Sequence, residues 1–138
     1  MNRIGSITPH FTWSEAVCRC GCEMPEEVAA EVVLTAEMME RVRAGLDALP
    51  INVAAWYRCP SHNAAIGGAP NSQHIYGRGV DFSQKGRAPT EVQRLIRARG
   101  LWPSPVRGLE IDEGHTHVDR RPGAAIVFTP AGEVLVTA

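Results

Sequence analysis

The chain lacks an excess of charge of either sign, has few aromatic residues and contains no long apolar run. Its 14 Lys and Arg residues nearly balance its 15 Asp and Glu residues. A protein that binds nucleic acid through the phosphates carries a basic excess, so this balance argues against a nucleic-acid partner. No apolar run approaches the roughly 20 residues of a membrane span. The first residues also lack the apolar core of a secretory signal peptide.

The length of the chain and its pattern of apolar residues fit one small globular domain. A length of 138 residues suffices for one compact domain but not for two ordinary ones. Apolar residues recur at helical spacing over 26–48 and 90–99. The expected strands are 51–57, 80–83, 107–112, 115–120, 124–129 and 133–137, with a hairpin turn at Pro130-Ala131-Gly132. After an irregular segment, 1–24, we therefore predict a single α+β domain over 1–138, with helices packed on a mainly antiparallel sheet.

Two clusters of potential metal ligands lie about 40 residues apart. His74 and Asp81 occur in and just after a Pro- and Gly-rich stretch, 59–79, and ordered loops of such length are usually functional. The second cluster consists of His115, His117 and Asp119. On a strand these three side chains project to one face, because side chains alternate. Two imidazoles and one carboxylate leave a fourth tetrahedral position open for water, which is typical of catalytic zinc.

A longer string of residues surrounds these clusters. It comprises Tyr57-Arg58-Cys59-Pro60-Ser61-His62-Asn63, Ser72-Gln73-His74, Gly77, Gly79, Asp81-Phe82 and His117-Val118-Asp119. From about Phe11 to Arg121 the chain resembles the M15 family of zinc peptidases, especially its D-alanyl-D-alanine carboxypeptidase and phage-endolysin branches. The resemblance implies an α+β fold shared with lysostaphin-type enzymes and the hedgehog signalling domain. It also implies a metallopeptidase that cuts peptide bonds near D-amino acids in bacterial peptidoglycan.

Carried over residue by residue, the resemblance also implies a site. The implied ligands of a catalytic Zn²⁺ are His74, Asp81 and His117. The resemblance implies that Arg58 and Ser72 face the substrate, and that Gln73 can contribute an amide to the oxyanion. Asp119 is then expected to orient a ligand His or to bond a neighbouring arginine.

The general base has several candidates. Many relatives have Glu or Asp three residues before the last zinc-binding His, and here that position is Gly114. Glu113 lies one residue further back, Asp112 lies three residues before His115, and His115 itself can replace a carboxylate. In an alternative register His115 is the ligand and Asp112 the base. The departure at Gly114 also motivates a second function, a catalytically inactive zinc-containing module that binds cell-wall or protein partners.

The four cysteines allow three interpretations. Cys18, Cys20 and Cys22 alternate in the N-terminal segment, and Cys59 lies in the motif string. They can close a second, structural zinc site, form disulfides, with three possible pairings if all four are used, or stay as thiols. The Cys-x-x-Cys spacing that is usual for structural zinc is absent.

The expected cellular location follows from the small size of the chain and from what is usual in the family that it resembles. With no signal peptide visible, we expect synthesis in the cytoplasm and action at the bacterial cell wall. Delivery through a holin or by a virion fits a phage or prophage lysis protein. We expect a monomer without a membrane span.

Overall fold

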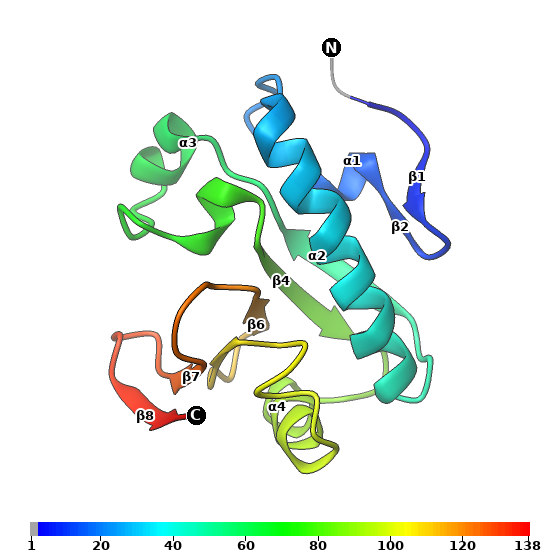
Figure 1. Cartoon of the computed structure of the whole chain (residues 1–138), viewed down its shortest axis with the longest axis vertical. Coiled ribbons are helices and arrows are strands. Elements are labelled where there is room, and N and C mark those ends of the chain that lie inside the picture. The colour runs from blue at the N-terminus through cyan, green and yellow to red at the C-terminus, as the bar shows by residue number, and fades with distance from the viewer. Residues whose placement is uncertain (1–2) are drawn as a thin grey trace.

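Six strands form the central sheet of residues 3–138, the part of the chain that this computed structural model describes (Figure 1). In chain order they are β3 (Ile51–Ala55), β4 (Gly79–Gln84), β5 (Gly108–Glu110), β6 (Thr116–Asp119), β7 (Ile126–Phe128) and β8 (Val134–Thr137). Across the sheet the order is β3-β4-β6-β5-β7-β8. Every neighbouring pair is antiparallel except β5 and β7, which are parallel. The predicted fold class, α+β with a mainly antiparallel sheet, is confirmed.

Two longer helices cover the sheet and supply most of the helical part of the core. The first is α2 (Glu26–Gly45), the long cyan helix of Figure 1, and the second is α4 (Pro89–Ala98). α2 ends three residues before the predicted 48 because Asp47 and Ala48 have φ of 65° and 56°. A left-handed backbone cannot continue a right-handed helix. The buried core includes Val32, Met39 and Val42 of α2, Val92 and Ile96 of α4, and Val80 and Phe82 of β4.

The N-terminal segment is more ordered than the sequence predicts. It contains β1 (Ser6–Thr8), β2 (Phe11–Thr12) and α1 (Trp13–Ala16), so the prediction of an irregular segment over 1–24 is wrong for these residues. Elements of two to four residues are too short to establish a periodic pattern. The backbone N–H of Tyr57 donates to the carbonyl of Ala16 at 3.0 Å, which joins this segment to the chain just after β3.

The long connection before β4 also contains short helices. These are α3 (Pro60–Ala65) and the 3-10 helix η1 (Gln73–Tyr76), which project beyond one end of the sheet in Figure 1. Asn63 is buried and donates to the carbonyl of Ala69 at 2.8 Å. Within residues 3–138 no helix combines the length and apolar character that crossing a bilayer requires.

Candidate active site

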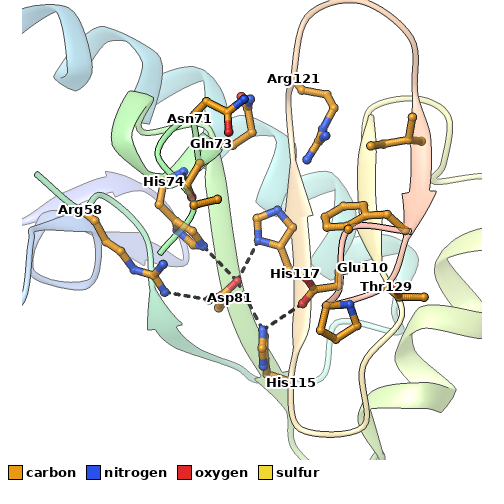
Figure 2. Close-up of a pocket in the computed structure, with 16 residues that line it drawn as sticks. Arg58, Asn71, Gln73, His74, Asp81, Glu110, His115, His117, Arg121 and Thr129 are labelled. Carbon is orange, nitrogen blue, oxygen red and sulfur yellow. Dashed lines mark hydrogen bonds and ion pairs between the residues drawn. The ribbon is translucent and has the colours of Figure 1, made fainter. Parts of the chain in front are cut away.

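Strand alternation gives β4 and β6 a core face and an opposite, polar face. Val80 and Phe82 of β4 are fully buried in the core, and Asp81 between them faces the other way. The sheet register pairs Asp81 with His117 of β6, and His117 with Glu110 of β5. The three polar side chains therefore form a row across neighbouring strands (Figure 2).

His74 reaches this row from η1. The hydroxyl of Ser72 accepts the backbone N–H of His74 at 3.3 Å, and Gly77 ends the turn with a φ of 74°. A side chain at Gly77 would also press on Val32 of α2. The Nδ1 of His74 lies 2.6 Å from the carbonyl of Trp56 and must donate there, because a carbonyl only accepts. Its Nε2 is left facing the row.

The three predicted ligands converge on one point. His74 Nε2 and His117 Nδ1 lie 3.1 and 2.9 Å from the same oxygen, Asp81 Oδ1. The three residues are buried, and each offers a donor atom within 4.8 Å of the others. Imidazole nitrogen and carboxylate oxygen are ligands that zinc binds at about 2.0–2.2 Å. The donor set therefore fits a small divalent cation.

A buried carboxylate holds the outer nitrogen of His117. His117 Nε2 lies 2.8 Å from Asp119 Oδ2, and Arg121 donates to both oxygens of Asp119 at 2.9 and 2.6 Å. Asp119 is fully buried, and its two strand partners are Gly79 and Gly108. A Cβ at Gly108 would overlap the Asp119 carboxylate. Glycine at this register therefore makes room for the pair that orients His117.

The electrostatics of the site favour positive charge between its carboxylates. Burial alone would raise the pKa of Asp81, but the hydrogen bond from His117 and the nearby His74 imidazole hold it well below its ordinary value. Burial would lower the pKa of His117, yet the carboxylates of Asp119 and Asp81 raise it to about 10. Burial lowers the pKa of His74, which favours the neutral imidazole that a metal ligand requires.

The three candidate ligands lie in a cleft of about 500 Å³, a volume typical of small-ligand sites. Its remaining walls come from Arg58, from the segment around η1 and from the turn between β7 and β8. The lining includes Arg58, Asn71, Ser72, Gln73, Glu110, His115, Arg121, Phe128, Thr129 and Pro130 (Figure 2). The predicted substrate-facing residues thus all line the cleft, and Arg58 lies 3.3 Å from Asp81 Oδ2.

Comparison with known proteins places the chain in a family. The model of the family described as Peptidase M15 matches residues 9–119. The chain belongs to peptidase family M15. It is also 27% identical over 89 residues to the zinc D-Ala-D-Ala carboxypeptidase of Streptomyces albus G, an alignment that covers 64% of this chain and 35% of that protein. The chain therefore spans about a third of that relative's length.

The structure of the M15 domain distinguishes between the three residues that the sequence offers as the general base. His115 lies just before β6 rather than within the strand, and lines the cleft with Nε2 3.8 Å from Asp81 Oδ1. Asp112 lies outside the lining, with Oδ2 3.8 Å from His115 Nδ1 and Oδ1 accepting the N–H of Gly114. Glu113 is exposed and also outside the lining.

Sequence reasoning missed Glu110. Its Oε1 lies 3.5 Å from His115 Nε2, it lines the cleft of the M15 domain, and burial raises its pKa. The sequence does place Glu110 on a predicted strand, 107–112. It does not reveal which residue of the next predicted strand, 115–120, pairs with Glu110. The structure therefore favours Glu110 over Glu113 as the carboxylate next to the ligands.

The Asp119 contact leads to a prediction about metal affinity. Asp119→Asn should weaken zinc binding by about 10–100-fold, because the amide holds His117 less firmly and leaves Arg121 without its charge partner. Competition with a calibrated chelator measures the affinity. Glu37→Gln, on the exposed face of α2, is the control for loss of a carboxylate elsewhere. Equal affinity in Asp119→Asn and wild type would show that His117 needs no such support.

Proposed function

We propose that this M15 domain is a zinc-dependent peptidase that hydrolyses peptide bonds in the stem peptides or cross-links of bacterial peptidoglycan. The observation that carries the proposal is the convergence of His74, Asp81 and His117 in an open cleft beside a further carboxylate. The name of the Streptomyces relative supports both the metal and the substrate class.

His74, Asp81 and His117 would hold the ion, which when bound supplies a Lewis acid and lowers the pKa of a water to about 7. Glu110 is placed to take a proton from the attacking water and to return it to the leaving amine. Its raised pKa suits both transfers, because a base works best near the operating pH. His115, beside Glu110, can donate a hydrogen bond to the oxygen that gains charge.

The cleft also offers groups that can position a peptide. Arg58 uses one terminal nitrogen on Asp81, and its remaining N–H donors suit a substrate carboxylate or carbonyl. Gln73 Oε1 is buried without a hydrogen-bond partner among residues 3–138. Gln73 and Ser72 both line the cleft, where the Gln73 amide can contribute to the oxyanion and the Ser72 hydroxyl can bond the substrate backbone.

Glu110 also bears on the alternative function. The inactive binding module was motivated by the missing carboxylate at Gly114, and Glu110 supplies a carboxylate in the cleft from another strand. We therefore favour hydrolysis. We further propose that the protein is a monomer and acts at the cell wall, after release by a holin or delivery by a virion.

Digestion of purified peptidoglycan tests the proposal. The zinc-loaded protein should release new amino groups, a chelator should stop the release, and added zinc should restore it. Mass spectrometry separates the two reactions, since a carboxypeptidase frees D-alanine from stem peptides and an endopeptidase divides cross-linked dimers. Zinc-loaded protein that binds peptidoglycan but releases no amine from either substrate would instead support the binding module.

A further inference from the structure

The four cysteines come together at a second place, outside the lining of the cleft. Cys18 Sγ lies 3.3 Å from Cys20 Sγ and 3.9 Å from Cys59 Sγ, and Cys20 Sγ lies 3.6 Å from Cys59 Sγ. Cys22 completes the group, in which all four sulfurs lie within 4.8 Å of one another. Residues 41 positions apart in the chain therefore share one small volume.

These separations match a tetrahedral metal site better than disulfides. The sulfurs of a disulfide lie about 2.05 Å apart, well below the separations seen here. Four thiolates at about 2.3 Å from one zinc ion lie about 3.8 Å from each other in a regular tetrahedron. The sulfur–sulfur distances of 3.3, 3.6 and 3.9 Å lie around that figure.

The backbone supports anionic sulfurs at this place. The N–H of Cys59 points to Cys18 Sγ at 3.4 Å, and the N–H of His62 points to Cys59 Sγ at 3.4 Å. Hydrogen bonds from backbone amides favour the charged form of an acceptor. Gly21 has a φ of 82° and donates its N–H to the carbonyl of Cys18 at 3.0 Å. This turn lets closely spaced cysteines face one point without the usual Cys-x-x-Cys spacing.

We propose that Cys18, Cys20, Cys22 and Cys59 bind a second zinc ion in a closed structural site. Four protein ligands leave no position for water or substrate, which distinguishes this site from the one in the cleft. The proposal does not depend on the peptidase activity, because it is carried by the thiol geometry alone.

The ion would tie the N-terminal segment to the cleft wall. Cys59 directly follows Arg58, whose guanidinium lies 3.3 Å from Asp81. Cys59 is also the N-cap of α3. Zinc at the cysteines would therefore fix the point from which Arg58 enters the cleft (Figure 2).

Metal content of the full chain, purified under reducing conditions with zinc, tests the proposal. We expect two zinc ions per chain in the wild type and one in Cys20→Ser. Cys20→His should keep two, because zinc accepts three thiolates and one imidazole. Asp81→Asn should lose the ion in the cleft and keep the other. With cobalt in place of zinc, the thiolate-to-cobalt absorption should disappear in Cys20→Ser and persist in Asp81→Asn.

A second measurement covers a Cys20→Ser variant that does not fold. Alkylation of the native wild type, followed by mass spectrometry, should show four thiols that react slowly with zinc bound and fast after chelation. Four thiols that react equally fast in both states would overturn the proposal, as would masses that show disulfides. A wild type without thiolate-to-cobalt absorption would overturn it as well, whatever its peptidase activity.

Discussion

Asp81→Asn is expected to lower peptidase activity by at least about 10³-fold and to remove zinc from the cleft. Both candidate ligand imidazoles approach the same atom, Asp81 Oδ1, at 3.1 and 2.9 Å. Asparagine has nearly the same shape but no negative charge, so the site loses its anionic ligand with little change in volume. Loss of the metal removes several kcal/mol of transition-state stabilisation, and each 1.4 kcal/mol or so is tenfold in rate.

Three measurements on the same preparation check this result. Hydrolysis of a stem peptide gives the rate, elemental analysis gives the zinc content, and the thermal midpoint reports folding. Asp47→Asn is a matched control, because Asp47 is exposed and pairs with Arg87 and Arg99 far from the cleft ligands in the sequence. It should keep full activity. Zinc and activity retained in Asp81→Asn would show that Asp81 is not a ligand.

The candidate ligands could be picked out from the sequence because each belongs to a local pattern. His117 and Asp119 alternate on a strand, and the Ser72-to-Asp81 string carries the family resemblance. The structure brings these residues together where the sequence predicts. The long helix was equally clear, apart from its end at Asp47, where a positive φ overrides good helical composition.

Sheet register was the part that the sequence did not reveal. Glu110 lies beside His117 only because β5 and β6 pair in one particular register. A shift of one residue would turn Glu110 toward the core and bring Leu109 to the cleft. The turn between these strands, which contains Asp112 and Glu113, has no short motif that fixes the pairing. The sequence therefore suggests the carboxylates near His117 along the chain, Asp112 and Glu113, and not the one beside it in the sheet.

The cysteine cluster was unpredictable for a related reason. Which of three interpretations holds depends on how α1 docks beside β3, and on the left-handed turn at Gly21. The docking of α1 is a tertiary contact, and the turn at Gly21 is the conformation of a single residue. Spacing alone counted against zinc, whereas the distances between the sulfurs favour it.

Glu110→Gln is also expected to have a large effect on peptidase activity. We expect kcat to fall by about 10²–10⁴-fold, the usual contribution of a positioned general base, because glutamine cannot accept the proton. KM and zinc content should change little, since Glu110 is not one of the three proposed ligands, His74, Asp81 and His117. Steady-state kinetics on a stem peptide and elemental analysis provide the three values.

Two further variants make the test decisive, because they remove the carboxylates that the sequence suggested. Glu113→Gln should retain wild-type kcat, since Glu113 is exposed and lies outside the cleft lining. Asp112→Asn should have a small effect, through its contacts with Gly114 and His115. If Glu113→Gln were the variant that lost kcat, residues 111–115 would have to rearrange when substrate binds. His74, Asp81 and His117 would then hold the metal, and Glu110 would not supply the base.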